Sequence, residues 1–351
     1  MSWYIELARP EIQALKAYEH ASWEPGLVRL HANELPWRSP ADTTVEGLNR
    51  YPEPHPLDLA ARLAPLYRVA PACALPSRGS DEGIDLLVRA YCRAAVDSVI
   101  ICPPTFGMYA VAARIQGAGV IEVPLPRAAG YALDVEAILA ALTPKVKLVF
   151  LCTPNNPTGN ALAAADILRL AEALAGRTLL VIDEAYADFS DAPSAAGLIG
   201  RYPGLVVLRT LSKAYGLAGA RCGILLGDPA IVGLLRRIIQ PYAVTQLTIE
   251  AVQRALEPAA LAVTRERVAS IVAERGRVAA ALAALPGVQK VWPSAANFLL
   301  VEFTDAAAAV ERTHAAGLLV RDLRRTPGLE RALRITIGSA EQNDRLLRSL
   351  A

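Results

Sequence analysis

Lys213 lies in a segment whose residue types are suited to amine chemistry. The segment follows a short apolar run at residues 205–210, and Arg221 lies eight positions beyond the lysine, after several glycines. A lysine at the exit of a buried strand is partly desolvated, which lowers the pKa of its amine and makes the amine nucleophilic. Such an amine can form a Schiff base with a carbonyl compound. Most lysines are solvated surface residues, so this assignment depends on functional residues in other segments of the chain.

A second segment, residues 77–83 (Ser-Arg-Gly-Ser-Asp-Glu-Gly), has the composition of a phosphate-binding helix start. Gly79 allows a close backbone approach, and the amides of Ser80, Asp81 and Glu82 would point out of the helix N-terminus, where the helix dipole favours an anion. A plain helix start, with Ser80 as N-cap and acids in the first turn, accounts for the same residues. Taken alone, the segment favours the plain start.

Two further segments place polar side chains directly after apolar runs. Residues 153–159 (Thr-Pro-Asn-Asn-Pro-Thr-Gly) specify a rigid turn, and Asn156 in it would meet ligands at the carboxyl end of a strand. Asp183 ends the next apolar run, where a carboxylate can hold a proton on a ring nitrogen, and Tyr186 can reach a neighbouring hydroxyl. A simple turn, a capping aspartate and a half-buried tyrosine remain the alternatives.

The segment around Lys213 also carries groups for a phosphate monoester. The hydroxyls of Thr210 and Ser212 and the guanidinium of Arg221 suit such an anion. A phosphate anchor, an acidic partner for a ring nitrogen, a hydroxyl donor and a nucleophilic lysine all fall at ends of expected strands. Pyridoxal phosphate requires this combination of groups.

The apolar pattern predicts a doubly wound α/β core over about residues 49–227. Candidate strands are residues 98–102, 120–123, 146–152, 179–183, 205–210 and 223–226. Nearly continuous Val, Ile and Leu runs indicate strands buried on both faces of a mainly parallel sheet. Helical patterns lie between them.

The pattern changes after residue 228. An Ala-rich helical stretch at 258–285 is followed by expected strands at 297–302 and 333–337 and helices near 306–316 and 341–350. We therefore expect three parts. They are an N-terminal segment (1–40) packing on the small domain, a large cofactor-binding domain (41–235) and a small α+β domain (236–351).

Composition excludes several classes of protein. The 351 residues are 53% hydrophobic and carry 36 Lys and Arg against 34 Asp and Glu, a net charge of +2 without basic clusters. We therefore expect no nucleic-acid partner. No apolar run reaches the roughly 18 residues that span a bilayer, so we expect no membrane association. Five scattered cysteines and four histidines without ligand spacing argue for a cytoplasmic protein without a metal site.

Taken together, the motifs resemble those of the fold-type I pyridoxal-phosphate-dependent aminotransferases (class II-type), and specifically the histidinol-phosphate aminotransferase family. The resemblance covers nearly the whole chain. Its motifs are residues 30–34, 49–53, 77–83, 103–109, 153–159, 183–186, 209–223 and 333–338.

The resemblance implies roles around the cofactor ring. Lys213 would be the Schiff-base lysine that also moves protons, and Asp183 would keep the ring nitrogen protonated. Asn156 and Tyr186 would contact the ring oxygen, and Phe106 would stack on the ring in a position where the family frequently has Tyr. Lys213, Asp183 and Tyr186 thus form the expected catalytic set.

The resemblance also implies how anionic groups are bound. The cofactor phosphate would be held by these residues: Gly79, Ser80, Asp81, Glu82, Thr210, Ser212, Arg221 and, from the other subunit of a homodimer, Tyr51. Arg334 would pair with the carboxylate of the amino or keto acid as a bidentate fork, assisted by Asn33. Tyr18 and Arg321 would bind the substrate phosphate, although a family proline is replaced in Leu15-Lys-Ala-Tyr18.

The expected reaction interconverts histidinol phosphate plus 2-oxoglutarate with imidazole-acetol phosphate plus glutamate. Three alternatives share much of the pattern: an aromatic or broad-specificity amino-acid aminotransferase, a threonine-phosphate decarboxylase, and a non-catalytic or transcription-regulatory relative. The last is disfavoured because Lys213, Asp183 and Arg221 are all present and no DNA-binding helix pair is appended.

Overall fold

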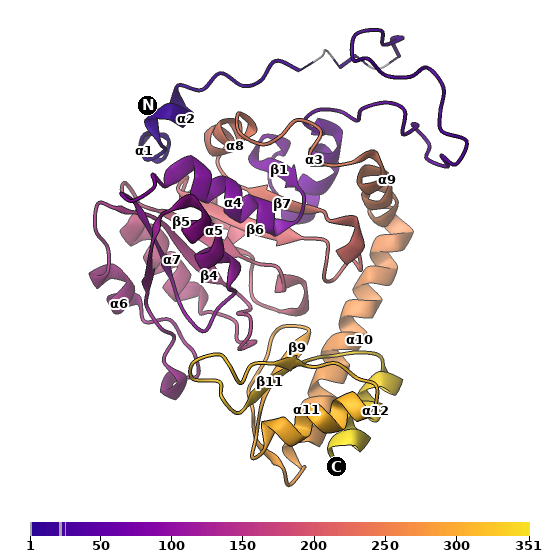
Figure 1. The fold of residues 1–351 in the computed structure, drawn as a ribbon. Coiled ribbons are helices and arrows are strands. Elements are labelled where there is room, and N and C mark those ends of the chain that lie inside the picture. Colours follow the sequence, from indigo (N-terminus) through magenta and orange to yellow (C-terminus); the bar gives the residue numbers. More distant parts are fainter. Residues whose placement is uncertain (1, 21–22, 25) are drawn as a thin grey trace.

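The chain folds into two bodies joined by one long helix. The computed structural model describes residues 2–20, 23–24 and 26–351. A large α/β body holds a seven-stranded sheet, a smaller body holds a four-stranded sheet, and α10 (Pro258–Ala283) runs between them (Figure 1). Within the described residues, no helix combines the length and the apolar character needed to cross a membrane.

The large sheet has the order β1-β7-β6-β5-β4-β2-β3. Its strands are β1 (Ala74–Ser77), β2 (Ser98–Ile101), β3 (Gly119–Glu122), β4 (Val146–Cys152), β5 (Leu179–Asp183), β6 (Leu205–Thr210) and β7 (Gly223–Leu226). Strand β7 pairs antiparallel with both β1 and β6, and the other pairs are parallel. The prediction of a mainly parallel sheet is thereby confirmed. The pattern missed β1, whose four residues include a proline.

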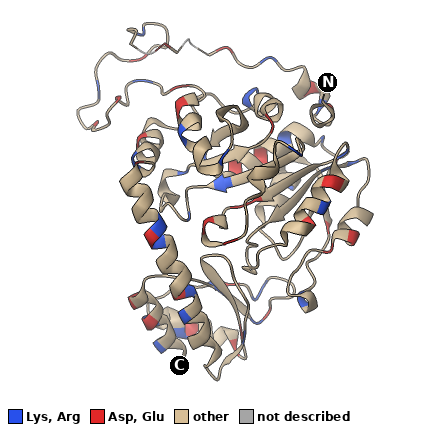
Figure 2. Ribbon diagram, turned by 180° about the vertical axis from the view of Figure 1, so that it is seen from behind, with Lys and Arg blue, Asp and Glu red and all other residues tan. Residues whose placement is uncertain are grey.

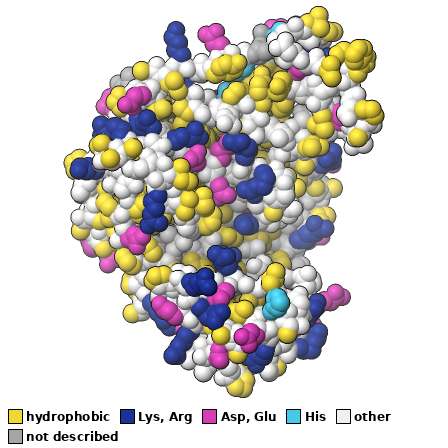
Figure 3. All heavy atoms as spheres, viewed as in Figure 1, with side chains coloured by type: hydrophobic (Ala, Val, Ile, Leu, Met, Phe, Trp, Pro, Cys, Tyr) yellow, Lys and Arg dark blue, Asp and Glu magenta, His cyan; other side chains and the backbone are white. Residues whose placement is uncertain are grey.

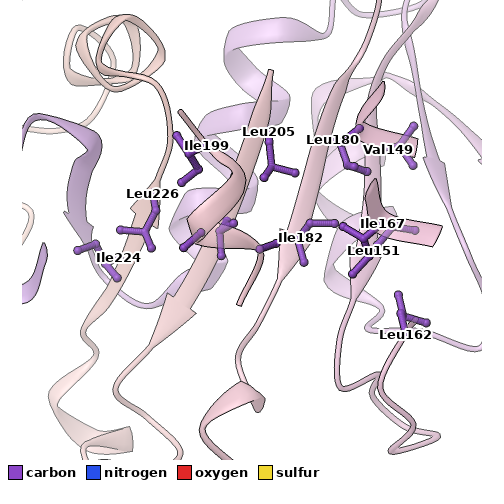
Figure 4. Close-up of a cluster of buried hydrophobic side chains, with 14 of the residues drawn as sticks. Val149, Leu151, Leu162, Ile167, Leu180, Ile182, Ile199, Leu205, Ile224 and Leu226 are labelled. Atoms are coloured by element: carbon purple, nitrogen blue, oxygen red, sulfur yellow. The ribbon is translucent and has the colours of Figure 1, made fainter. Parts of the chain in front are cut away.

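Helices cover both faces of this sheet because its central strands are apolar on both sides. In β5, Leu180 and Ile182 point into one core, while Leu179 and Val181 point into the other. Figure 4 shows the first core, in which side chains of β4 to β7 meet Ile167 of α7 (Ala164–Leu174). Alternation within continuously apolar strands thus gives each face its own layer of helices.

The remaining helices of the large body are α3 (Leu57–Leu63), α4 (Ser80–Tyr91), α5 (Met108–Gln116), α6 (Val135–Ala140), α8 (Pro229–Arg236) and α9 (Gln246–Ala255). Short 3-10 turns are η1 (Ala64–Tyr67), η2 (Pro71–Cys73), η3 (Arg127–Ala129), η4 (Ala187–Phe189), η5 (Ala195–Leu198) and η6 (Ala218–Ala220).

The small body is an antiparallel sheet with the order β10-β11-β9-β8, covered by helices. Its elements are β8 (Val288–Val291), β9 (Phe298–Phe303), α11 (Ala306–Ala315), β10 (Arg321–Asp322), β11 (Ala332–Thr336) and α12 (Ala340–Leu350). Its core includes Leu299 and Val301 of β9 and Leu333 and Ile335 of β11. The two longer strands and both helices lie within one residue or so of the ranges expected from sequence.

The two bodies separate later in the chain than the sequence pattern indicated. Helix α9 follows the expected boundary at residue 235, yet it packs on the large body. Thr248 Oγ1 donates to the carbonyl of Ala220 at 2.7 Å, and Glu250 Oε1 accepts from the amide of Val45 at 3.0 Å. The change of body therefore falls at α10.

The N-terminal helices α1 (Trp3–Glu6) and α2 (Pro10–Gln13) lie against the large body rather than the small one. The amide of Arg9 donates to the carbonyl of Ala90 at 2.9 Å, and Arg237 Nη1 donates to the carbonyl of Gln13 at 2.8 Å. Figure 1 places this segment at the far end from the small body. Two short helices expose too little apolar surface to reveal, from sequence alone, which body they cover.

Residues 14–20, 23–24 and 26–56, which we call the strap, form an extended segment along the outside of the large body in Figure 1. Large apolar side chains of its described part are exposed: Leu27, Val28, Leu30, Leu35 and Trp37. Charged residues of both signs are interspersed over the ribbon in Figure 2. In Figure 3, basic side chains lie on both bodies around the waist between them.

Candidate active site

A hollow of about 480 Å³, open to solvent, lies where β4, β5 and β6 end. Its lining residues are Ser80, Asp81, Phe106, Cys152, Asn156, Asp183, Ala185, Tyr186, Thr210, Ser212, Lys213 and Arg221. Most of the residues expected around a cofactor ring and its phosphate thus share one hollow. Parallel strands bring their carboxyl ends to one edge of the sheet, which explains why segments far apart in sequence meet here.

The start of α4 and the start of β7 cross at very short range. Gly79 has φ of 86°, a conformation that favours glycine. A Cβ on Gly223 would lie 2.5 Å from Ser80 N, and one on Gly79 would lie 2.7 Å from Arg221 Nη2. Both positions require glycine, and the result is an uncluttered helix N-terminus with an arginine beside it.

Arg221 is held at this N-terminus by its own loop. Its Nη1 donates to Ser212 Oγ at 3.3 Å and to the carbonyl of Ala218 at 3.2 Å, and its Nη2 lies 3.5 Å from Asp81 Oδ2. Thr210 Oγ1 donates to Ser212 Oγ at 3.0 Å. Two hydroxyls, a guanidinium and the first amides of α4 therefore surround one position, as an anion requires.

Asp183, at the end of β5, is a buried carboxylate on the hollow wall. It is 3% exposed, and its oxygens accept from Tyr109 Oη at 2.7 Å and from the amide of Ala185 at 3.0 Å. Burial raises the pKa of Asp183 to about 6, because loss of water disfavours the charged form more than these hydrogen bonds favour it. A cationic ring nitrogen would be its natural partner.

Tyr109 contacts the candidate site through Asp183, although the sequence assigned it no role. It is fully buried, its ring stacks on Phe150 with centroids 5.0 Å apart, and Phe106 meets it edge-on at 5.7 Å. Tyr109 is in the first turn of α5, three residues after Phe106, which lies before the helix begins. That spacing was the available signal, but the hydrogen bond to Asp183 spans 74 residues.

Lys213 opens into the hollow beside Tyr186, with its Nζ 5.5 Å from the centre of the tyrosine ring. Burial lowers the pKa of the Lys213 amine, and the positive charges of Arg334 and Arg221 lower it further. A larger share of the amine is therefore neutral, as a nucleophile or a base requires.

Arg334 of β11 links the small body to the hollow. Its Nη1 donates to Asn156 Oδ1 at 2.5 Å, while Asn156 Nδ2 donates to Tyr186 Oη at 3.4 Å. Its guanidinium lies 5.3 Å from the ring centre of Phe298, and its Nε is buried without a hydrogen-bond partner among the described residues. The Arg334 Nε–H, a buried donor beside the hollow, is suited to bind a carboxylate ligand.

Arg321 lies directly opposite Arg334 in the β10–β11 pair. Burial lowers the pKa of Arg334, and the neighbouring charge of Arg321 lowers it further. Two like charges side by side favour an anion between them or near them. The small body therefore contributes two of the expected substrate residues at one place.

Seven expected residues are not among those that line the hollow: Gly79, Arg321 and Arg334, described above, and Glu82, Tyr51, Asn33 and Tyr18. The amide of Glu82 donates to the carbonyl of Gly79 at 3.3 Å, and the Glu82 carboxylate accepts from Arg78. Tyr51, Asn33 and Tyr18 lie in the strap, with Tyr51 stacked on Tyr242 at 4.7 Å. Within one chain, the strap residues and the hollow are thus not assembled into one site.

Behind the hollow, a buried ion cluster fixes the loop after Asp183. Arg209 Nη1 donates to Glu184 Oε2 at 2.9 Å and its Nη2 to Asp188 Oδ1 at 2.8 Å, while Glu184 also accepts from Ser194 Oγ at 2.6 Å. Leaving any one of these charges unpaired is strongly unfavourable, so the cluster resists rearrangement. It ties the ends of β5 and β6 together.

The arrangement has room and donors for a flat, phosphate-bearing pyridine ring. The glycine cradle and Arg221 suit its phosphate, buried Asp183 suits its ring nitrogen, and the Lys213 amine suits its aldehyde. Each contact draws on the chemistry of the donor present. The residues therefore fit pyridoxal phosphate.

Comparison with known proteins supports this interpretation. The model of the family described as aminotransferase class I and II matches residues 37–350. The histidinol-phosphate aminotransferase of Stenotrophomonas maltophilia (strain R551-3) is 50% identical over 351 residues, covering 99% of this chain and 96% of the relative. The histidinol-phosphate aminotransferase of Xylella fastidiosa (strain 9a5c) is 50% identical over 347 residues, covering 98% of this chain and 95% of the relative.

Solved structures give the same picture. A histidinol-phosphate aminotransferase from Sinorhizobium meliloti in complex with pyridoxal-5'-phosphate is similar with a TM-score of 0.76 and 29% identity, covering 86% of this chain and 82% of that chain. An L-threonine-O-3-phosphate decarboxylase from Porphyromonas gingivalis is similar with a TM-score of 0.74 and 26% identity, covering 86% of this chain and 90% of that chain.

Proposed function

Because the chain belongs to the aminotransferase class I and II family, we propose that it is a pyridoxal-phosphate-dependent histidinol-phosphate aminotransferase. It would convert histidinol phosphate and 2-oxoglutarate to imidazole-acetol phosphate and glutamate. The observation that carries this proposal is 50% identity over almost the entire chain to relatives named for that activity. The hollow with Lys213 and Asp183 supports it independently.

When bound, pyridoxal phosphate supplies an electron sink for the substrate carbon next to the amino group. Asp183 Oδ would keep a proton on the ring nitrogen, because a cationic ring would neutralise the buried carboxylate charge that now has only Tyr109 Oη and the amide of Ala185 as hydrogen-bond donors. Lys213 Nζ, partly neutral because its pKa is lowered, would carry a proton between the substrate carbon and the cofactor. Asn156 and Tyr186, which are hydrogen-bonded to each other at 3.4 Å, would contact the ring oxygen.

Arg334 would bind the carboxylate that glutamate and 2-oxoglutarate share, using its fork beside Asn156. Asn33, which lies in the strap and away from the hollow of its own chain, would assist from a second copy. Arg321, next to Arg334 in the sheet, would bind the phosphate of histidinol phosphate, together with Tyr18 from the strap of a second copy. In this arrangement the small body selects the substrate, and the large body holds the cofactor.

A homodimer in the cytoplasm completes the proposal. The exposed apolar side chains of the strap, among them Leu30 at 91% and Trp37 at 77% exposure, support an interface with a second copy. Tyr51 of each strap would then reach the cofactor phosphate of the partner. Light scattering in solution tests the dimer, and a monomeric active enzyme would contradict it.

The reaction is tested with the purified holoenzyme. Addition of histidinol phosphate should shift the cofactor absorbance, and addition of 2-oxoglutarate should then yield glutamate without release of CO₂. Release of CO₂ from threonine phosphate would favour the decarboxylase, and equal rates with aromatic amino acids would favour the broad-specificity aminotransferase. The 26% identity to the decarboxylase is the weaker similarity.

Lys213→Ala tests the catalytic role directly. Loss of its amine should lower turnover by about a thousandfold or more. Lys145→Ala, which removes an exposed lysine of the same body, serves as control. A Lys213→Ala enzyme with wild-type turnover would refute the assignment.

A further inference from the structure

Glu34 is a buried carboxylate on a strap that is otherwise largely exposed. Its side chain is 3% exposed, whereas Leu30 and Leu35 on either side of it are 91% and 69% exposed. The strap exposes its leucines to solvent and shields the Glu34 carboxylate, so its local conformation is organised around this carboxylate. The strap is therefore ordered by a polar centre and not by an apolar one.

Three donors from two parts of the strap converge on this carboxylate. Arg50 Nη1 lies 3.0 Å from Glu34 Oε2, Arg29 Nη2 lies 3.4 Å from Oε1, and the amide of Tyr51 donates to Oε1 at 2.7 Å. Burial alone would raise the pKa of Glu34, but the Tyr51 amide and the two arginines hold it below its ordinary value. The acid is therefore charged and fully engaged.

Tyr51 is fixed on three sides by this cluster and its surroundings. Its amide donates to Glu34, its carbonyl accepts from Arg29 Nη1 at 3.1 Å, and its ring stacks on Tyr242 with centroids 4.7 Å apart. Tyr242 is itself fixed, with φ of 62° and its amide bonded to the carbonyl of Pro54 at 3.0 Å. Even so, Tyr51 remains 51% exposed.

A side chain that is held so firmly and yet exposed is prepared to contact something outside its own chain. We propose that Glu34 is a positioning residue, which holds Tyr51 in the orientation needed to contact the cofactor phosphate of a second copy of this chain. The inference rests on the proposed function, which supplies the cofactor. Holding a contact in place beforehand strengthens binding because the ordering is not required at the moment of binding.

The test uses Glu34→Gln in the full-length protein. Glutamine keeps the shape but loses the charge that two arginines and an amide share. The dissociation constant of pyridoxal phosphate, measured by fluorescence on cofactor-free protein, should rise about tenfold. That of pyridoxal, which lacks the phosphate, should stay unchanged. Glu46→Gln, an exposed acid of the same strap, is the matched control and should change neither.

A double-mutant cycle decides whether Glu34 acts through Tyr51. Tyr51→Phe removes the hydroxyl and should itself weaken binding of pyridoxal phosphate. In the Tyr51→Phe protein, Glu34→Gln should raise the dissociation constant of pyridoxal phosphate by less than a further twofold, because the contact that Glu34 positions is already lost. An undiminished tenfold effect in the Tyr51→Phe protein, or an equal loss for pyridoxal, would overturn the proposal and leave Glu34 with a purely structural role.

Hydrogen exchange in the cofactor-free protein gives a readout that is independent of binding. The Tyr51 amide should exchange at least about tenfold faster in Glu34→Gln than in the wild type, since its acceptor is weakened. Unchanged exchange would contradict the geometry on which the proposal rests. Failure of the proposed function is recognised separately, as a wild-type protein that does not bind pyridoxal phosphate or does not transfer the amino group.

Discussion

Replacing Asp183 with Asn should stabilise the cofactor-free protein at neutral pH while it disables the enzyme. The carboxylate is 3% exposed, and burial raises its pKa from 3.8 to about 6. Between these two values the unfolded chain has lost the proton and the folded chain keeps it. The free energy of unfolding therefore falls as the pH rises through this window, and the full loss is present above about pH 6.

The size of the effect follows from the two pKa values, 3.8 and about 6. At about 1.36 kcal/mol for each factor of ten, the loss amounts to ~1.6 kcal/mol at pH 5 and ~3 kcal/mol at pH 8. Asparagine carries no charge, so the Asp183→Asn variant does not suffer this loss of stability. The altered hydrogen bond to Tyr109 costs about 1 kcal/mol, but that cost does not depend on pH in this range. The advantage of the variant should therefore grow by ~1.4 kcal/mol between pH 5 and pH 8.

Urea unfolding of cofactor-free wild type and Asp183→Asn at the two pH values measures this difference. Asp134→Asn, at the exposed N-terminus of α6, controls for the general effect of replacing an aspartate by an asparagine. With cofactor added, the variant should lose most of its turnover because the ring nitrogen loses its acidic partner. A variant that is less stable than wild type by the same amount at both pH values would show that the Asp183 charge is not unfavourable in the fold.

Two further predictions concern the cradle and the substrate fork. Gly223→Ala should weaken binding of pyridoxal phosphate at least about tenfold and destabilise the protein by about 1–3 kcal/mol, because the added Cβ would lie 2.5 Å from Ser80 N. Gly219→Ala, whose Cβ would meet nothing within 4 Å, is the control. Equal binding of pyridoxal phosphate by both variants would show that Gly223 does not form a phosphate cradle. Arg334→Lys keeps the charge but loses the fork that contacts Asn156. The value of kcat/KM should therefore fall about a hundredfold, or ~3 kcal/mol, for 2-oxoglutarate and, in the reverse direction, for glutamate, because these two substrates carry the carboxylate. Unchanged values for both would contradict the carboxylate contact.

The central strands were the most predictable part of the fold. Strands β4, β5, β6 and β7 have the ranges expected from sequence, because each is a continuous apolar run between polar or glycine residues. Strand β1 escaped detection, since four residues with a proline carry no periodic signal. Its place beside β7 depends on the close passage of Gly79 and Gly223, which are distant in sequence.

The hollow was predictable for a topological reason. Asp183 is the last residue of β5, and Asn156 and Lys213 follow its parallel neighbours β4 and β6; such strands end at one edge of a sheet. Contacts that cross between layers or bodies were not predictable. Tyr109 reaches Asp183 from α5, and Arg334 reaches Asn156 from the small body, over separations of 74 and 178 residues.

By itself, the amino-acid sequence determined the central strands β4 to β7 and the polar residues at their ends, and hence the chemistry that the chain offers there. Local apolar periodicity and residue type are properties of neighbours along the chain. Only the tertiary structure decided that Tyr109 tunes Asp183, that Arg334 closes on Asn156, and that the N-terminal helices lie on the large body. Those pairings join residues far apart in sequence, and the packing of whole layers, rather than any local pattern, brings them together.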